Sequence, residues 1–313
     1  MISNRGLVLK LENFSRCSAI WEMLFNQTPN PSPFTSFDWF HDLCENLLKV
    51  DPKIMIFFEN DQPVGIIPGV IEDDTLRLLG DERVTDINDM IYLPGYEHRI
   101  IKGLASFTKS RNLHVELFPL EKQSPLILYL PKFVDDVIIE EIDTCPILCL
   151  PDSWEAYLNN LDGKLRHELR RKLRKAAQVT TQSIGAEHIE ILFNLMTASD
   201  INKKEFLNDE ICEFFNSIAH SFFKNDWLRF RATFLDSQPI GVLFSFQYKD
   251  RIYLYNSGFD PDFSHLSPGI IAIGIDIKAA IDEGFKYYDF LRGEEKYKLH
   301  FGAQKRYTVR LRR

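Results

Sequence analysis

The residues best suited to chemistry form a dense charged cluster, RGEEKYK at positions 292–298, directly after an apolar stretch. Its carboxylates could accept a proton, its phenol could donate one, and its cations could hold an anion. Loops that follow strands on a rigid scaffold often carry functional side chains, which favours a site at this position. A solvated turn is the alternative interpretation, because runs of charge after strands are common.

Two elements must position this cluster. Isoleucines at 270, 273, 277 and 281 recur at spacings of three and four, which predicts an amphipathic helix that ends at Gly284. A strand is predicted from Lys286 to Leu291. The tripeptide Ser267-Pro268-Gly269 stands at the start of the helix and supplies an N-cap candidate, a fixed φ and a residue without Cβ. The amides at the helix start are therefore expected to face an anion closely, and phosphate suits that end.

Length and composition are those of an ordinary soluble globular protein. The chain has 313 residues, of which 45% are hydrophobic and 26% charged, so it is long enough for two domains. No apolar run reaches the length of a bilayer span, and the first residues lack the long apolar segment of a secretory signal. We therefore expect a cytoplasmic protein without a transmembrane segment.

The sequence lacks the motifs of several common metal-binding and cofactor-binding sites. The five cysteines are scattered without CxxC spacing, and the eight histidines form no HxxxH or HxH pair. There is no GxSxG elbow, Walker loop or GxGxxG, which argues against an α/β-hydrolase, a P-loop enzyme and a Rossmann dehydrogenase. We expect no metal and no tightly bound cofactor, and acyl transfer from a carrier remains as the expected chemistry.

Positive charge is concentrated in one segment of an acidic chain. The net charge is −8, yet residues 164–175 carry seven cations against the single acid Glu168, a local charge of +6. Arg166, Arg170 and Arg174 recur every four residues and predict a guanidinium stripe on one face of an amphipathic helix. A solvated helix face and contact with phosphate or another polyanion are both open interpretations. The uneven distribution favours a local anionic partner over general affinity for DNA.

Two halves of the chain repeat one pattern of strand, turn, strand, helix and strand. Three pairs of segments match in the same order: Gln62-Pro63-Val64-Gly65 with Gln238-Pro239-Ile240-Gly241, Leu93-Pro94-Gly95 with Ser267-Pro268-Gly269, and Val115-Glu116-Leu117 with Tyr288-Asp289-Phe290. Matched spacing over this length predicts two similar α/β domains, each a mixed sheet flanked by helices. We place them at residues 1–150 and 151–313. Only the second copy carries the charged cluster, so we expect it to be catalytic and the first to be degenerate.

The order of hairpin, strand, Ser-Pro-Gly helix, strand and charged turn resembles the GNAT acyltransferase superfamily. More narrowly, the sequence resembles the BioF2-like or CelD-like group, which is related to the FemAB peptidoglycan aminoacyltransferases. The resemblance covers nearly the whole chain. It is carried most clearly by Trp154, Tyr157, the arginines of segment 164–175, the Gln238 turn, Asn256-Ser257-Gly258-Phe259-Asp260, and Asp289 through Lys298. It implies a tandem duplicated GNAT fold of the α/β (α+β) class, in agreement with the repeat.

The resemblance also implies where an acyl donor binds. GNAT enzymes hold the pantetheine of acyl-CoA between two splaying strands and its pyrophosphate at the start of the following helix. The matching donor-binding positions here are Tyr255, Asn256, Ser257, Ser267, Gly269, Ile270 and Ile271. The usual donor loop, (Q/R)xxGxG/A, is absent, and residues 266–271 contain a single glycine. This departure leaves acyl-CoA, a carrier-protein thioester and aminoacyl-tRNA open as co-substrates.

Acyl transfer to an amine needs a group that removes a proton and donors that hold the developing oxyanion. Asp289 and Glu295 are the candidate bases, although Asp289 is alternatively a buried partner of Arg292. Tyr297 or Tyr255 is the candidate acid for the departing thiolate. The candidate binding residues for an acidic acceptor or a donor phosphate are Arg166, Arg170, Arg174, Arg292 and Lys298.

The resemblance implies an N-acyltransferase that acts on the amine of a sugar, an amino acid or an envelope or polysaccharide precursor. One alternative is a FemAB-type enzyme that uses aminoacyl-tRNA, in which the cationic helix would hold RNA. Another is a non-catalytic module that binds an anionic lipid head group or a polysaccharide. Peripheral association with a membrane is compatible with an envelope precursor as the acceptor.

Overall fold

The computed structural model describes residues 3, 4 and 6–313, and the chain divides into two compact units. Unit 1 extends to Asp143 and also includes Tyr307–Arg313, whereas unit 2 is Thr144–Arg306. The sequence-based boundary at residue 150 assigned everything after it to the second domain. The last strand departs from that assignment because it pairs with a strand of unit 1. The chain therefore passes from one unit to the other twice.

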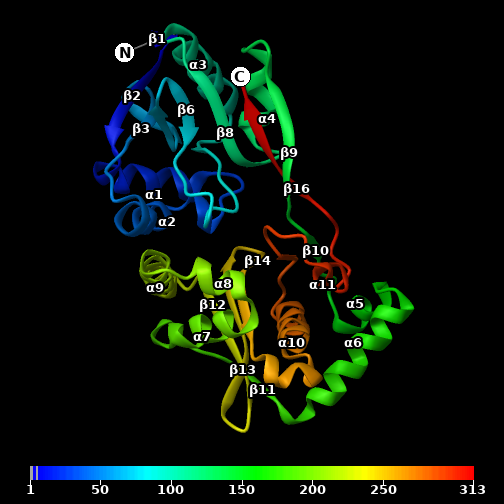
Figure 1. The fold of residues 1–313 in the computed structure, drawn as a ribbon. Helices are drawn as coiled ribbons and strands as arrows, with labels where there is room; N and C mark the ends of the chain where they lie inside the picture. Colours follow the sequence, from blue (N-terminus) through cyan, green and yellow to red (C-terminus); the bar gives the residue numbers. More distant parts are fainter. Residues whose placement is uncertain (1–2, 5) are drawn as a thin grey trace. The chain divides into compact units, whose positions relative to one another are not determined.

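Unit 1 is built on two five-stranded sheets, with strand orders β1-β2-β3-β4-β7 and β5-β6-β8-β16-β9 (Figure 1). The strands are β1 (Ser3–Asn4), β2 (Leu7–Asn13), β3 (Lys53–Glu59), β4 (Gln62–Ile67), β5 (Gly69–Glu72), β6 (Thr75–Leu78), β7 (Ile91–Tyr92), β8 (His114–Glu121), β9 (Ile138–Thr144) and β16 (Tyr307–Arg312). The α-helices are α1 (Ser18–Gln27), α2 (Phe37–Leu43), α3 (Glu97–Ser110) and α4 (Pro125–Tyr129). Ser124 caps the short helix α4 by accepting from the Leu126 N–H.

The core of unit 1 lies between its sheets and α3. Helix α3 turns its apolar face, from Ile100 to Phe107, onto β2 and β3, while Lys102 and Lys109 are exposed. The aromatic segment before and within α2 is also buried, with Phe34, Trp39 and Phe40 fully covered. These rings therefore belong to the core of unit 1.

Unit 2 is a single six-stranded sheet, in the order β10-β15-β14-β13-β12-β11, covered by helices on both faces. Figure 1 shows α7 to α9 on one side of this sheet and α10, followed outward by α5 and α6, on the other. The strands are β10 (Ile147–Cys149), β11 (Thr180–Ser183), β12 (Leu228–Leu235), β13 (Gln238–Tyr248), β14 (Arg251–Phe259) and β15 (Tyr287–Asp289). The α-helices are α5 (Trp154–Asn160), α6 (Gly163–Lys175), α7 (Ile189–Ser199), α8 (Ile201–Phe206), α9 (Asp209–Lys224), α10 (Pro268–Asp282) and α11 (Lys296–Leu299), and a 3-10 segment, η7 (Pro261–Leu266), precedes α10.

Helix α10 forms where the isoleucine spacing predicted it. Ile273, Ile277 and Ile281 are buried against the sheet, and Gly284 follows the helix with a φ of 88° that favours glycine. Helix α6 packs on α10 through its leucines: a Cβ on Gly274 would lie 3.1 Å from Leu169. Close packing at this glycine fixes α6 beside α10 and leaves the charged side of α6 in solvent.

The predicted duplication is present in the strand order. Unit 1 runs β3, β4-β5, β6, α3, β8 and unit 2 runs β12, β13, β14, α10, β15. In both, the last two strands of the series pair in parallel. The repeated Gln-Pro pairs lie at the start of β4 and β13, just after the turns, and both hairpins carry a bulge there: Phe57 pairs with Gly65 and Thr233 with Gly241 just before the register shifts. The fold is thus a tandem repeat of one mixed α/β unit.

Within the described part of the chain, no helix combines the length and the apolar character needed to cross a lipid bilayer.

Candidate active site

The centre of unit 2 is a place where two parallel strands part. β14 pairs with β15 only as far as Tyr253 opposite Asp289, although β14 continues to Phe259. From Leu254 onward, the edge of β14 that faced β15 has no strand beside it. A bulge lies in the same stretch, because Leu254 and Asn256 have partners on β13 while Tyr255 is skipped. Bulges redirect side chains and backbone groups, so this edge presents polar groups to an incoming ligand.

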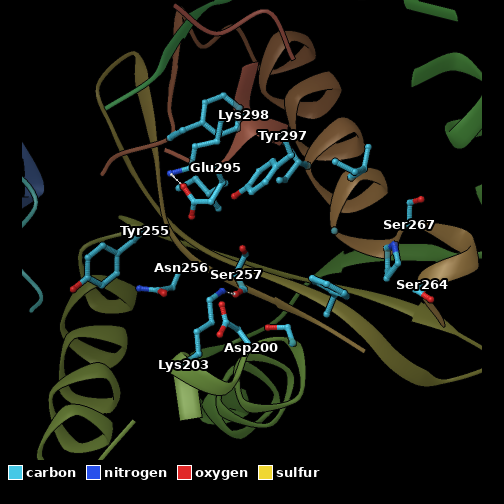
Figure 2. Close-up of a pocket in the computed structure, with 18 of the residues that line it drawn as sticks. Asp200, Lys203, Tyr255, Asn256, Ser257, Ser264, Ser267, Glu295, Tyr297 and Lys298 are labelled. Atoms are coloured by element: carbon cyan, nitrogen blue, oxygen red, sulfur yellow. Dashed lines mark hydrogen bonds and ion pairs between the residues drawn. The ribbon is translucent and has the colours of Figure 1, made fainter. Parts of the chain in front are cut away.

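A cavity of about 500 Å³ opens at this divergence. Figure 2 shows its polar side chains arranged around β14, with Glu295 and Lys298 on one wall and Asp200 and Lys203 on the opposite wall. Its lining comes from four places in the chain: Ser199, Asp200 and Lys203 at the α7–α8 junction; Leu254 to Ser257 and Phe259 of β14; Ser264, Ser267, Pro268, Gly269, Ile270 and Ile273 around the start of α10; and Phe290, Arg292, Glu295, Tyr297 and Lys298 after β15.

The start of α10 forms one end of the cavity. Ser267 has a left-handed φ of 59°, and its side chain does not cap the helix. Its N–H donates to the Ser264 carbonyl. Pro268 has no N–H, so the first turn leaves the Gly269 and Ile270 amides without partners inside the helix. The predicted donor-binding residues Ser267, Gly269 and Ile270 all line the cavity. Ile271 does not, because it points into the apolar core and is fully buried.

The charged cluster after β15 forms one wall of the cavity. Lys298 is only 4% exposed, and its Nζ donates to the Arg292 carbonyl and to Glu295 Oε2, each at 2.9 Å. Glu295 is 54% exposed, so its carboxylate is accessible for further contacts. Buried ammonium groups need such acceptors, and the loop from Arg292 to Glu295 wraps the lysine to supply them. The structure thus brings Glu295, Arg292 and Lys298 together at one cavity, and their roles stay predictions.

Tyr297 lies beside Glu295 and is suited to donating a proton. Burial first, and then the charge of Glu295, raises the pKa of the Tyr297 phenol well above its usual value, while a hydrogen bond with Ser257 opposes the shift. The phenol therefore keeps its proton at neutral pH. Its contact with Ser257 places the hydroxyl at the open edge of β14, where a ligand lying along that strand would pass (Figure 2).

The opposite wall was missed by the sequence-based prediction. Lys203 of α8 reaches across to β14 and donates to the Ser257 carbonyl at 2.5 Å. Burial lowers the pKa of Lys203, an effect that Glu295 and Asp200 oppose through their charges. Asp200 caps α8 by accepting from the Asn202 N–H at 2.8 Å. This cap, an Asp directly before Ile201-Asn202-Lys203, was the one available signal, because α8 is too short to show a periodic pattern.

Asp289 does not reach the cavity, which corrects its assignment as a base. Its carboxylate is fully buried, accepts from Arg306 at 2.6 Å and the Leu291 N–H at 3.0 Å, and lies 3.5 Å from Arg251. Its partners are thus two other arginines and not Arg292. A carboxylate enclosed by two guanidiniums has no free access to an amine, so a structural role follows from the geometry.

Unit 1 supports this interpretation of Asp289. Glu116 occupies the matching position on β8, and it too pairs with two arginines, Arg77 at 3.3 Å and Arg310 at 3.6 Å. The acid is therefore retained in the copy that has no charged cluster. An ion pair that recurs in both repeats is more simply explained by the fold than by catalysis.

The arginine stripe of α6 also lies away from the cavity. Arg170 and Arg174 border a separate shallow hollow of about 560 Å³ between α5 and α6, together with Trp154 and His167. Arg170 pairs with Glu155 at 3.2 Å, and Arg166 donates to Asn159 at 3.4 Å. The structure therefore does not place these three arginines with Arg292 and Lys298, and their role in substrate binding is not supported by the geometry of the cavity.

Metal chemistry has no candidate site among the residues that the structure describes, since no three His, Cys, Asp or Glu side chains there lie close enough to share an ion. The cavity instead combines an open strand edge, an anion-binding helix start, a carboxylate, a protonated phenol and two lysines. These groups are suited to binding an extended amide-containing chain that ends in a phosphate, and to moving protons beside it.

The segment that forms most of this cavity matches a known domain. Residues 163–299 match the family model for the acetyltransferase (GNAT) domain, whereas no curated protein matches the sequence. The fold is similar to FemX, with 10% identity and a TM-score of 0.67 over 97% of this chain and 96% of FemX. It is also similar to L-PGS from Bacillus licheniformis, with 10% identity and a TM-score of 0.59 over 94% and 91% of the two chains.

A third structure carries the duplication itself. A tandem GNAT protein from the clavulanic acid biosynthesis pathway has 9% identity and a TM-score of 0.52, over 97% of this chain and 98% of that protein. At such identities the likeness concerns the fold, and the narrower resemblance to the BioF2-like or CelD-like group stays a prediction. Residues 163–299 therefore match an acetyltransferase (GNAT) domain, and the fold of the chain is a tandem GNAT fold.

Proposed function

We propose that unit 2 transfers an acyl group from a thioester donor, such as acyl-CoA, to the amine of a sugar, an amino acid or an envelope precursor. The observation that carries the proposal is that one cavity holds the open edge of β14, the start of α10 and the pair Glu295 and Tyr297. The GNAT domain match over the same residues supports it.

The donor would lie along β14 as an added strand. The amides of a pantetheine arm can exchange hydrogen bonds with the unpaired edge from Leu254 to Phe259, as a peptide does at a sheet edge. Its phosphate would then meet the Gly269 and Ile270 amides at the positive end of α10. The thioester would come to the narrow end of the divergence, near Tyr255 and Ser257, where Tyr297 also reaches.

The transfer forms a C–N bond and breaks the C–S bond. The amine attacks the thioester carbonyl and loses a proton, which the Glu295 carboxylate is placed to accept and pass to solvent. The departing thiolate takes the Tyr297 proton, which burial keeps on the phenol before the transfer, and the tyrosinate left behind regains a proton from solvent. Lys203 and Lys298 supply positive charge on opposite walls for an acidic acceptor or for the developing oxyanion.

The test is a transfer assay with a panel of acyl thioesters and amines on the whole protein. Glu295→Gln and Tyr297→Phe should fold normally and lower kcat/KM by roughly 10²-fold, the scale of losing an acid or base. Glu294→Gln is the matched control, because Glu294 is exposed and bonds only to Thr144 among its recorded contacts. Full activity in both Glu295→Gln and Tyr297→Phe would contradict these roles.

Two other functions stay as predictions from the sequence. An aminoacyl-tRNA donor is tested by adding charged tRNA to the same panel. If no donor supports transfer and the protein binds an anionic lipid or a polysaccharide tightly, the result favours the non-catalytic module. Location in the cytoplasm and peripheral association with membranes likewise stay predictions.

A further inference from the structure

The end of the cavity at the start of α10 is suited to a ligand that carries little negative charge. The segment that leads into α10 carries Asp260 and Asp262, and the Asp260 carboxylate accepts from the Asp262 N–H at 3.0 Å and from Gln238 at 3.3 Å. Beyond them, the helix start offers the Gly269 and Ile270 amides. Two amides suit one phosphate, whereas CoA carries two more, the second phosphate of its pyrophosphate and the 3′-phosphate, which neighbouring carboxylates would repel.

A second basic surface of α6 borders this end of the cavity. Leu165, Lys172 and other α6 residues share a small hollow with His300 and Ile270, and Ile270 also lines the main cavity. Residues three or four apart are neighbours on a helix, so one continuous strip adjoins that hollow. We call it the outer basic face of α6; it consists of Lys164, Arg171, Lys172 and Lys175 with the single acid Glu168.

The outer basic face differs from the arginine stripe, which faces α5. Lys164, Arg171 and Lys175 are all exposed, and α6 is held in place by packing of Leu169 and Leu173 against Gly274. The helix has 13 residues, which corresponds to a length of about 20 Å. A rigid row of cations of this length is complementary to an acidic helix of a small partner, while the remainder of the chain, at −14, would repel such a partner elsewhere.

We propose that the acyl donor is a small acidic carrier domain that presents its acyl group on phosphopantetheine and docks on the outer basic face of α6. This inference rests on the proposed function. A carrier-bound arm ends in a single phosphodiester, which matches the two amides of α10, and its protein part supplies the negative charge that the cations of α6 attract. In the transfer, the C–S bond to the carrier's pantetheine breaks and its thiol leaves with the proton from Tyr297.

The experiment compares one acyl group on three donors: an acidic acyl carrier protein, CoA and free pantetheine, with one amine acceptor. We expect kcat/KM for the carrier to exceed that for CoA by about 10-fold or more and to fall as salt is raised. Arg171→Glu combined with Lys175→Glu should lower kcat/KM for the carrier about 10-fold and leave that for pantetheine unchanged. The control is Lys224→Glu combined with Lys249→Glu, an equal charge change at exposed positions elsewhere in unit 2.

The possible outcomes separate the two proposals. If CoA is as good a donor as the carrier, or if the two double variants behave alike, the docking proposal is overturned while acyl transfer stands. If no thioester reacts, pantetheine included, the proposed function fails as well. Transfer from charged tRNA alone would overturn the carrier and assign the basic face to RNA.

Discussion

The Asp289→Asn variant tests whether the Asp289 carboxylate has a structural or a catalytic role. The substitution keeps the shape of the side chain and its bond to the Leu291 N–H, but it removes the charge between Arg251 and Arg306. Removing one member of a buried ion pair costs about 3–5 kcal/mol. The two guanidiniums are 23% and 17% exposed, so water can compensate in part, and we expect about 3 kcal/mol. For a domain of this size, that loss lowers Tm by about 6–12 °C.

The measurements are thermal and urea unfolding, followed by turnover assays well below the lowered Tm. We expect Asp289→Asn to retain turnover within about 3-fold, since the carboxylate touches no group of the cavity, whereas a lost base costs roughly 10²-fold. Asp282→Asn is the control, because this carboxylate is 55% exposed and pairs only with Lys278 in its own helix. A variant with unchanged Tm and roughly 10²-fold lower turnover would refute the reasoning and restore Asp289 as the base.

Three further changes test other parts of the structure. Burial raises the pKa of the Asp89 carboxyl to about 7, so this carboxyl ionises at lower pH in the unfolded chain than in the folded protein, and the free energy of unfolding declines between about pH 4 and about pH 7. Asp89→Asn should remove this decline. In urea unfolding, the variant should be more stable than the wild type by about 2 kcal/mol at pH 8 but not at pH 4. Lys203→Gln keeps a donor for the Ser257 carbonyl but no charge, so kcat should fall about 10-fold with little change in KM; an unchanged kcat would show that the cation is dispensable. Gly258→Ala would place a Cβ 2.5 Å from the backbone of Leu195 and Met196 and should lower the free energy of unfolding by about 2 kcal/mol. The control is Gly163→Ala, whose Cβ would have no atom within 4 Å, and this variant should be nearly neutral in thermal unfolding.

Local patterns predicted the parts of the fold that local forces determine. The isoleucines of α10 and the glycine after it specify a helix and its end without reference to the rest of the chain. The repeated Gln-Pro pairs each begin the second strand of a hairpin, directly after a two-residue turn of positive φ, and both hairpins carry the same bulge. Glu295, Tyr297 and Lys298 of the charged cluster line one cavity, as their places within four positions of each other suggest, and their roles stay predictions.

Features that depend on distant residues could not be predicted in the same way. Strand alternation allowed Asp289 to point into a cleft or into the interior, and Arg306, 17 residues away, decides between them. Lys203 joins the cavity only because α8 packs beside the open edge of β14, which no pattern in α8 shows. The arginine stripe was predicted correctly as a helix face, but its spacing carries no information on what that face meets.

The return of β16 to unit 1 has a consequence for how the protein is made. β8 finds one of its two neighbours in β16, whose residues are synthesised after the whole of unit 2. Unit 1 therefore begins before unit 2 and is completed after it, in contrast to the usual order in which one domain folds before the next is synthesised. Until then β8 is an open strand edge, which can pair with another nascent chain. Slow translation of unit 2 should accordingly favour aggregation through β8.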